Sequence, residues 1–243
     1  MLRRYLAPLL AVMTGLAPVA ARADFDAGVA AYTRGDVAAA VAEWTADAAA
    51  GHVGAAWLLG NLYAQGKGVA RSDRLAFTYF LQAAEAGHPG ARVAVGRYYR
   101  EGNKDAEVER DYAAALDWFD KAALQADGEA QYYLGLMHRN GEGVRRDRAE
   151  SLRWYLLSVK KHYVPAFLAL ATIYMKGEGV PENQPDGAMY LALARAKATP
   201  EQLPEVEATE NRLLANMALG ERAKAAERAQ SWLEAHPYGE TAR

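Results

Sequence analysis

The chain repeats one sequence phrase four times, and this repetition limits its possible folds more than any other feature. Each copy carries a small residue at the same point of an apolar segment, and successive small residues are 36, 39 and 36 positions apart. These residues are Gly60, Gly96, Gly135 and Ala171. A period of this length is typical of stacked supersecondary units that contact only their neighbours, so it argues against a single closed core.

Each copy contains two segments with the spacing of amphipathic helices. Their apolar residues recur at offsets of three, four and seven, as at Ala76, Phe80 and Ala83, which places one apolar stripe on a helix. The second segments of the four copies are residues 76–84, 115–123, 151–159 and 187–194. The pattern predicts an all-α protein, an α/α superhelical solenoid built of helix-turn-helix repeats.

Glycines and acids mark the turn between the two predicted helices of a unit. Gly66, Gly141 and Gly177 each open a Gly-x-Gly triplet after the first helix, where glycine suits a left-handed C-cap. Asp73 and Asp147 follow where an N-cap or a first-turn acid stabilises the second helix. These residues predict where each first helix ends and each second helix begins.

The second copy departs from this pattern in its turn. Gly102 and Ala115 are 13 positions apart, whereas the equivalent Gly66 and Ala76 are 10 apart. Three extra residues therefore lie within 103–109, and their composition predicts a longer, charged and exposed turn. Binding residues often lie in such loops, although loops also tolerate insertions that have no function.

The repeated unit reads Ala-x-x-x-Leu-Gly-x-x-Tyr-x-x-Gly-x-Gly-Val, followed by Asp, Ala and Trp-Tyr/Phe-x-x-Ala-Ala. It resembles the Sel-one-like repeat (SLR), an α/α solenoid repeat related to tetratricopeptide repeats. The resemblance covers residues 52–198 as four copies, and residues 24–51 more loosely as a degenerate, tetratricopeptide-like opening repeat. It implies adaptor or scaffold work in protein–protein interaction, which in bacteria often belongs to exported or envelope-associated assemblies.

The segment after the repeats is predicted to close the solenoid. A solenoid must shield its last apolar face, and residues 199–243 have the charged helical composition of a C-terminal cap. Thr199 followed by Pro200 predicts an N-cap with proline at the first helical position. Helical patterns then cover 201–217 and 221–234, separated at Gly220.

The first 23 residues have the pattern of a secretory signal peptide. Arg3 and Arg4 precede an apolar run from Tyr5 to Ala20, and the segment ends in Ala21-Arg22-Ala23. We expect cleavage after residue 23 and a periplasmic or secreted protein with no stable membrane span. The alternative is a segment retained as an N-terminal anchor.

Composition removes several functional classes. There is no cysteine, which excludes disulfides, thiolate nucleophiles and cysteine metal sites. The net charge of −2 argues against nucleic-acid binding. The five histidines form no metal-binding pattern, and Ser158-x-x-Lys161 lacks the partner motifs of penicillin-binding enzymes. We therefore predict no cofactor, no metal site and no catalytic residue.

The predicted binding site is the concave surface. First helices line the inner wall of such solenoids, and offsets of zero, four and seven mark one face of each helix. Arginines and aromatic residues on this face are typical of binding hot spots. We expect an unidentified protein or peptide partner, with an acidic or carboxylate-bearing segment suiting the arginines. The alternative is an envelope hydrolase or a glycan-binding protein. The predicted contact residues are Trp57, Asn61, Arg97, Arg100, Tyr132, Leu136, Arg139 and Thr172.

Overall fold

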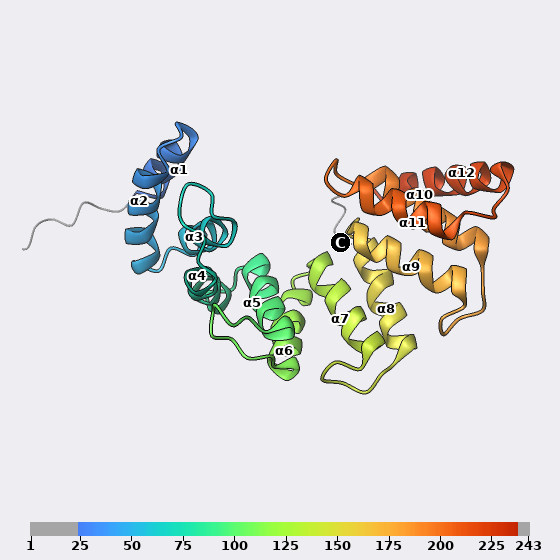
Figure 1. Cartoon of the computed structure of the whole chain (residues 1–243), viewed down its shortest axis with the longest axis horizontal. Coiled ribbons are helices and arrows are strands. Elements are labelled where there is room, and N and C mark those ends of the chain that lie inside the picture. Colours follow the sequence, from blue (N-terminus) through green and yellow to red (C-terminus); the bar gives the residue numbers. More distant parts are fainter. Residues whose placement is uncertain (1–23, 238–243) are drawn as a thin grey trace, which may run out of the picture.

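The computed structural model describes residues 24–237 and shows an all-α arch within that range. Twelve helices follow one another as antiparallel neighbours, with no strand among the described residues beyond one isolated bridge between Asn103 and Val108. Figure 1 shows the two ends of the arch rising on either side of an open space. The predicted signal peptide (1–23) and the last part of the predicted cap (238–243) lie outside the described residues.

The helices pair as the repeat predicts. The opening unit is α1 (Phe25–Thr33) with α2 (Val37–Ala49), and the cap is α11 (Leu203–Leu213) with α12 (Leu219–Ala235). In Figure 1, α3, α5 and α7 lie nearer the open side of the arch than their partners α4, α6 and α8. The four repeats pair α3 (Val53–Gln65) with α4 (Asp73–Glu85), α5 (Pro89–Glu101) with α6 (Tyr112–Ala123), α7 (Gly128–Asn140) with α8 (Arg148–Val159), and α9 (Val164–Lys176) with α10 (Gln184–Lys197).

The small residue of each first helix lets an aromatic ring of the second helix lie against the backbone. A Cβ atom placed on Gly60 would be 2.5 Å from Phe80 Cδ1, and one on Gly96 would be 2.7 Å from Phe119 Cε1. Both rings are buried. The predicted close approach of the two helices therefore depends on the missing side chain.

The predicted helix ends are confirmed at the glycine turns. Gly66, Gly141 and Gly177 are C-caps with φ of 67°, 77° and 65°, a region that glycine enters without steric cost. Asp147 is the N-cap of α8. For α4 the N-cap is Ser72, and Asp73 is the first-turn acid.

Histidines cap two of the first helices. Nδ1 of His52 accepts from the amide of Ala55 at 3.1 Å, and Nδ1 of His88 accepts from the amide of Ala91 at 3.2 Å. Each ring satisfies a backbone donor that has no intrahelical partner. The two Gly-His turns between units therefore have a structural use.

The turn with three extra residues is less exposed than predicted. Asn103 and Val108 exchange backbone hydrogen bonds of 2.8 and 2.9 Å, which folds the turn back on itself. Ala106 and Val108 are then buried, with 7% and 8% of their surface exposed. The charged side chains stay outside, and Arg74 of the preceding unit forms an ion pair with Glu107.

The cap also differs in detail from its prediction. Residues 199–202 form a turn in which the Gln202 amide donates to the Thr199 carbonyl at 2.9 Å, so α11 begins only at Leu203. The break between the cap helices lies at 214–218, and Gly220 is inside α12. Arg222 donates to the Leu214 and Met217 carbonyls, which satisfies the backbone where α11 ends.

Apolar side chains gather in three clusters along the arch. One joins the opening unit to the first repeat and reaches α5, one lies within α5–α7, and the largest joins the last repeats to the cap. No single centre collects them within residues 24–237, as the repeat period predicts. Stability must therefore depend on each helix pair and each contact between neighbours.

We predict that Gly96→Ala destabilises the protein by about 1 kcal/mol, because overpacking a tight contact costs ~1–3 kcal/mol while alanine gains only ~0.5–1 kcal/mol over glycine within a helix. The measurement is urea unfolding followed by helical circular dichroism. Gly220→Ala is the control, since a Cβ there meets nothing within 4 Å. Equal stability of the two variants would contradict the packing role of Gly96.

Candidate functional site

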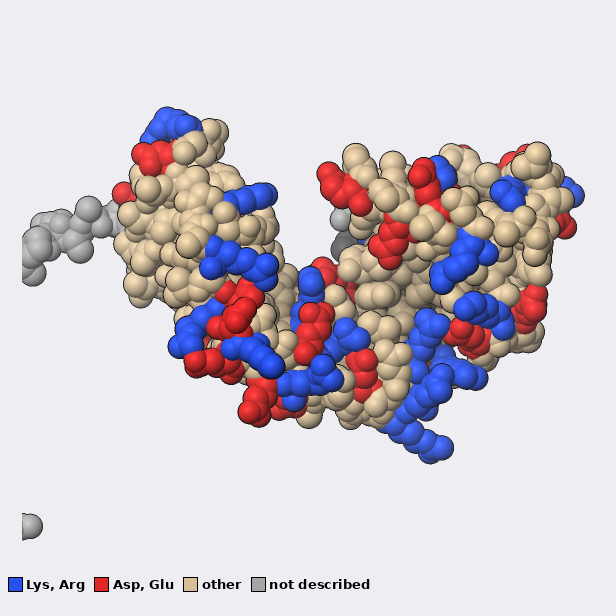
Figure 2. Space-filling view, in the orientation of Figure 1, with Lys and Arg blue, Asp and Glu red and all other residues tan. Residues whose placement is uncertain are grey.

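The inner wall of the arch is formed by the first helices and carries the predicted contact residues. Figure 2 shows the wall as a hollow between the two arms, with acidic and basic side chains mixed along it. The structure divides the predicted residues between two cavities and leaves Arg100 between them.

Arg100 and Arg139 are held by glutamates of the following unit. Nε of Arg100 is 2.6 Å from Oε2 of Glu142, and both side chains are 17% exposed. Arg139 pairs with Glu178 in the same way one unit later. We call these two ion pairs the Arg–Glu ladder. The sequence predicted that these guanidinium groups are open to an acidic segment of a partner, whereas the structure places a carboxylate of the protein itself against Arg100 and against Arg139.

Burial and charge act in opposite directions on the first pair of the ladder. Burial acts to lower the pKa of Arg100, but the hydrogen-bonded Glu142 outweighs it and the pKa is raised. Burial likewise acts to raise the pKa of Glu142, but hydrogen bonds from Arg100 and Asn140 hold the pKa below its ordinary value. Both groups are therefore stabilised in their charged forms.

Arg97 is more open than the ladder arginines. Half of its side chain is exposed, and its Nη1 is 3.7 Å from Oε1 of Glu129. Arg97 and Arg100 both lie over the ring of Tyr133, with Cζ 5.9 and 5.7 Å from its centre. This is cation–π geometry. Burial raises the pKa of Tyr133 to about 12, so the ring stays neutral.

Trp57 and Asn61 line the first cavity, together with Arg97. The cavity has a volume of about 350 Å³ and lies between α3 and α5. The Trp57 ring stacks on His88 with centroids 4.6 Å apart. Nδ2 of Asn61 donates to the Trp57 carbonyl at 2.8 Å, which leaves its Oδ1 as an acceptor.

Tyr132, Leu136, Arg139 and Thr172 line a second, smaller cavity of about 170 Å³. Its other wall belongs to the cap helix α11, which contributes Glu205, Thr209 and Arg212. The cap therefore covers part of the inner wall at this end of the arch. The sequence did not predict this cover, because the path of α11 depends on its packing against α9 and α10.

Sequence reasoning also missed the acidic partners of the arginines. Glu142 and Glu178 occupy the same position after Gly141 and Gly177, in a segment interpreted only as a turn. Their repetition in register with Arg100 and Arg139 was a usable signal.

Comparison with protein families finds four matches to the Sel1 repeat, over residues 53–88, 89–127, 128–163 and 166–197. Together they cover more than half of the chain. The chain belongs to the Sel1 repeat family. Sel1 repeats typically mediate protein interactions, and the fold generally serves as a non-catalytic scaffold or adaptor.

Solved Sel1 repeat structures share the arch. The c5321 protective antigen of uropathogenic Escherichia coli, with an SLR fold, aligns over 87% of this chain with a TM-score of 0.72 and 22% identity. This chain spans 45% of that protein, less than half of its length. A Sel1 repeat protein from Oxalobacter formigenes aligns over 90% of this chain and 85% of its own, with a TM-score of 0.69 and 24% identity.

One curated relative has a named role. The exopolysaccharide production negative regulator of Rhizobium meliloti strain 1021 is 28% identical over 195 residues. The alignment covers 76% of this Sel1 repeat protein and 71% of the relative.

Ser158 has a structural role in this Sel1 repeat protein. The side chain is fully buried, and its hydroxyl donates to the carbonyl of Gly128, at the start of α7 in the same repeat, at 2.6 Å. Between residues 24 and 237, no group of three or more His, Asp or Glu side chains is placed to hold a metal ion. No helix in that stretch combines the length and apolarity needed to cross a bilayer.

We predict that Arg100→Ala lowers the free energy of unfolding at pH 7 by about 2 kcal/mol, because it removes the cation from the largely buried Glu142 carboxylate and leaves it only the hydrogen bond from Asn140. The pKa of Glu142 is depressed from its ordinary 4.5 in the folded protein. The pair therefore stabilises the fold above pH 4.5, and this contribution is lost as the pH falls through the folded-state pKa.

Urea unfolding at several pH values between 7 and 3 measures this loss. The destabilisation by Arg100→Ala is expected to shrink at acidic pH. Arg153→Ala is the control, since its pair with Glu150 on α8 is 3.4 Å long with Arg153 69% exposed. Such exposed pairs contribute ~0.2–1 kcal/mol. Equal effects of the two substitutions would show that the Arg100–Glu142 pair stabilises the fold no more than an exposed surface ion pair does.

Proposed function

We propose that this Sel1 repeat protein is an exported, non-enzymatic adaptor that binds a peptide or protein partner along the inner wall of its arch. The observation that carries the proposal is the hollow wall itself. Residues from successive first helices open together onto one surface, and they include an exposed arginine, an asparagine acceptor and an aromatic ring. Such a mixture is typical of protein-binding surfaces.

We include export in the proposal because the predicted signal peptide ends just before the first helix. The predicted cleavage point after residue 23 falls directly before Asp24, which is the N-cap of α1. Cleavage there leaves every described helix intact. A cleavable signal peptide supports a periplasmic or secreted location. Because the protein has no cysteine, its fold there is stabilised by packing and not by disulfides.

Glycan binding is the second candidate, and one finding favours it. The Rhizobium meliloti relative is named for a role in exopolysaccharide production. The first cavity also offers aromatic rings at Trp57 and Tyr98 beside polar groups, a combination that suits a sugar ring. The hydrolase form of this alternative has no support from Ser158, whose hydroxyl is buried and engaged.

We predict that a photocrosslinking amino acid at position 97 or 136 captures a discrete protein in living cells, because both positions face the inner wall. Purification followed by mass spectrometry identifies the adduct. A probe at Leu124, which is 87% exposed in a turn between units, is the control. Absence of protein above this control, together with co-purification of a polysaccharide, would favour the glycan-binding candidate.

We predict that the protein isolated from its native host begins at Asp24. The measurement is intact mass and N-terminal sequencing of the full-length gene product from the envelope or culture fraction. Ala23→Arg, which removes the small residue before the cleavage point, is expected to leave a longer precursor. A wild-type chain that keeps its first 23 residues would support the anchored alternative.

A further inference from the structure

The Arg–Glu ladder is missing at the first interface between repeats. Arg100 and Arg139 each lie four residues after the small residue of their helix, and Ala64 has that place in the first repeat. Glu142 and Glu178 each follow the first glycine of a turn, where the second repeat has Asn103. Neither half of the ion pair is therefore present between α3 and α5.

A second difference between the repeats leaves more open space at the first interface. Tyr133, over which Arg97 and Arg100 lie, is two residues before Gly135. The equivalent residue before Gly96 is Ala94. Ala64 and Ala94 both line the cavity of about 350 Å³ at the first interface. The cavity thus lies where the next interface holds a guanidinium and a tyrosine ring.

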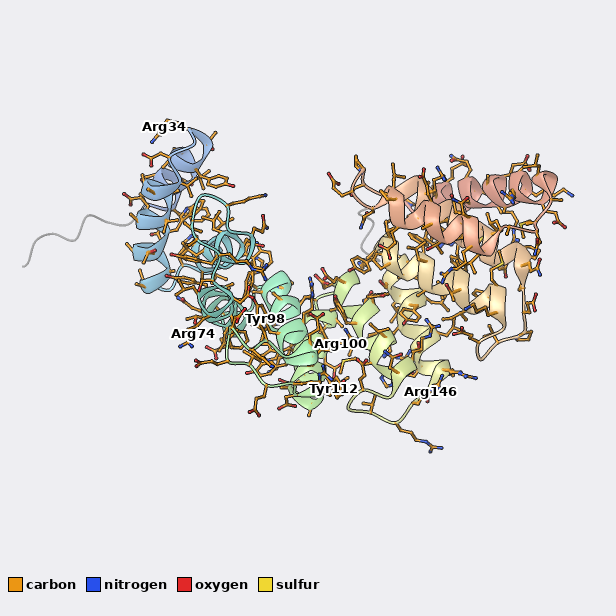
Figure 3. The ribbon with its side chains drawn as sticks, viewed as in Figure 1. Arg34, Arg74, Tyr98, Arg100, Tyr112 and Arg146 are labelled. Carbon is orange, nitrogen blue, oxygen red and sulfur yellow. The ribbon has the colours of Figure 1, made fainter. Side chains whose placement is uncertain are left out.

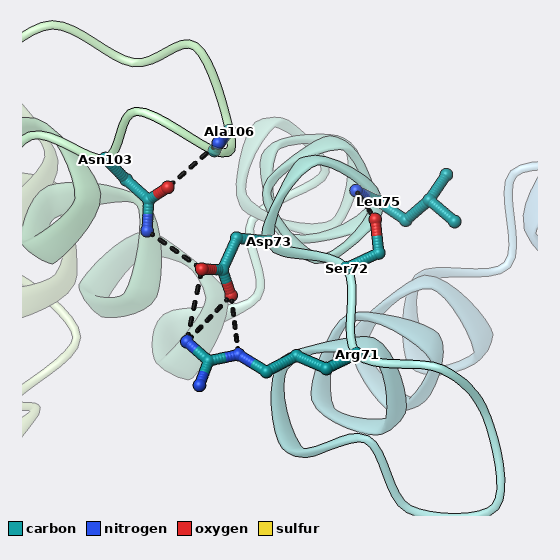
Figure 4. Close-up of polar contacts among 6 residues, drawn as sticks. All are labelled: Arg71, Ser72, Asp73, Leu75, Asn103 and Ala106. Atoms are coloured by element: carbon teal, nitrogen blue, oxygen red, sulfur yellow. Dashed lines mark hydrogen bonds and ion pairs between the residues drawn. The ribbon is translucent and has the colours of Figure 1, made fainter.

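Asn103 takes part in a different contact that leaves the cavity open. Its Nδ2 donates to Oδ2 of Asp73 at 3.2 Å, while Arg71 donates to both oxygens of the same carboxylate at 3.1–3.2 Å (Figure 4). Asp73 is 8% exposed, and the hydrogen bond from Arg71 lowers its pKa. Its charge is thus neutralised within the wall.

The remaining charges give the cavity an acidic excess. Its lining contains the acids Asp73, Glu101 and Glu129 but only two bases, Arg71 and Arg97. Arg71 pairs with Asp73, and Arg97 approaches Glu129. Glu101 has an Arg100 nitrogen at 4.0 Å, but that guanidinium is already bound to Glu142. Glu101 therefore shares its nearest cation with Glu142.

Aromatic rings line the same cavity as the Glu101 carboxylate. Trp57 and Tyr98 line the cavity, and Tyr98 lies where α5 packs against α4, with its ring centroid 6.4 Å from that of Phe80 (Figure 3). Burial raises the pKa of Tyr98, so its ring remains neutral. A cation between neutral rings and a carboxylate gains both cation–π and ionic attraction.

We propose that this cavity is an anchor for an arginine or lysine side chain of the partner protein. The proposal rests on the adaptor function, and names the part of the partner that the first interface recognises. The neighbouring interfaces support it directly, because the protein's own Arg100 and Arg139 place guanidiniums at the equivalent position. A side chain from outside completes the ladder that the first repeat leaves open.

Burial at Glu129 supports the same charge preference. Burial raises the pKa of Glu129, and the attraction of Arg97 offsets this only in part. An added cation in the cavity therefore relieves an electrostatic cost, whereas an added carboxylate increases it. The basic anchor replaces the acidic segment that the sequence favoured.

The direct test uses a small probe, Nα-acetyl-arginine N-methylamide, with ¹⁵N-labelled protein. We expect a saturable shift of the Trp57 indole N–H at millimolar probe, with the signal assigned by its absence in Trp57→Phe. The citrulline analogue has nearly the same shape without the charge, and its binding is expected to be at least fivefold weaker. Equal shifts from the two probes, or a larger shift from the glutamate analogue, would overturn the proposal.

Three variants test the open volume of the cavity and its charge separately. Ala64→Arg supplies the missing guanidinium from within and is expected to weaken probe binding at least tenfold. Leu124→Arg adds the same charge at a distant exposed site and is expected to leave binding unchanged. Glu101→Gln keeps the volume and is expected to weaken binding severalfold. Circular dichroism verifies that each variant is folded, and undiminished binding by folded Ala64→Arg would refute the anchor.

A final comparison separates this inference from the adaptor function. Crosslinking from position 136, outside the cavity, is repeated in the Ala64→Arg background. Loss of the captured protein in that background supports the anchor. Equal capture in both backgrounds would leave the adaptor function intact and reject the anchor. A shift of Trp57 by chitotriose but not by the arginine probe would reject it in favour of a glycan.

Discussion

The structure depends on one contact that is repeated along the chain, the contact between a residue with little or no side chain and an aromatic ring. Phe80 lies on the backbone at Gly60, and Phe119 lies on the backbone at Gly96. The ring fills the space where a Cβ atom would stand, which lets the two helices of a unit approach closely. Because the contact recurs with the sequence period, the helix pairs are similar and their stacking produces the arch.

The inner wall is stabilised by a different interaction. Arg100 and Arg139 extend from the last turns of first helices to glutamates in the next unit, so each ion pair joins two repeats. They also occupy the wall, which means that basic residues there cannot simply be counted as a free binding surface.

Because the ion pairs occur at only some interfaces between repeats, the inner wall is filled in some places and open in others. The ladder fills it at the second and third interfaces between repeats, and α11 covers its far end. At the first interface Ala64, Ala94 and Asn103 leave an open, aromatic and mildly acidic cavity. A repeat protein of this kind gains specificity where one unit departs from the pattern, because the departure exposes groups that its neighbours keep paired.

Local spacing in the sequence was enough to predict the helix pairs and the turns within them. The period fixed the helix pairs, and glycine at positions 66, 141 and 177 fixed the turns, since a left-handed cap depends on the residue itself. The inner-wall positions of Trp57 and Arg97 also followed from helical periodicity. Local rules failed at the cap, where packing placed the break at 214–218 instead of Gly220.

Which charged side chains pair with one another depends on how the helix pairs stack. Arg100 and Glu142 are 42 residues apart, and their pairing depends on the rise and rotation from one unit to the next. The same long-range geometry placed α11 over the second cavity and left the first one open. Helical periodicity tells which face a side chain occupies, but the partner on that face is set by how whole helix pairs stack.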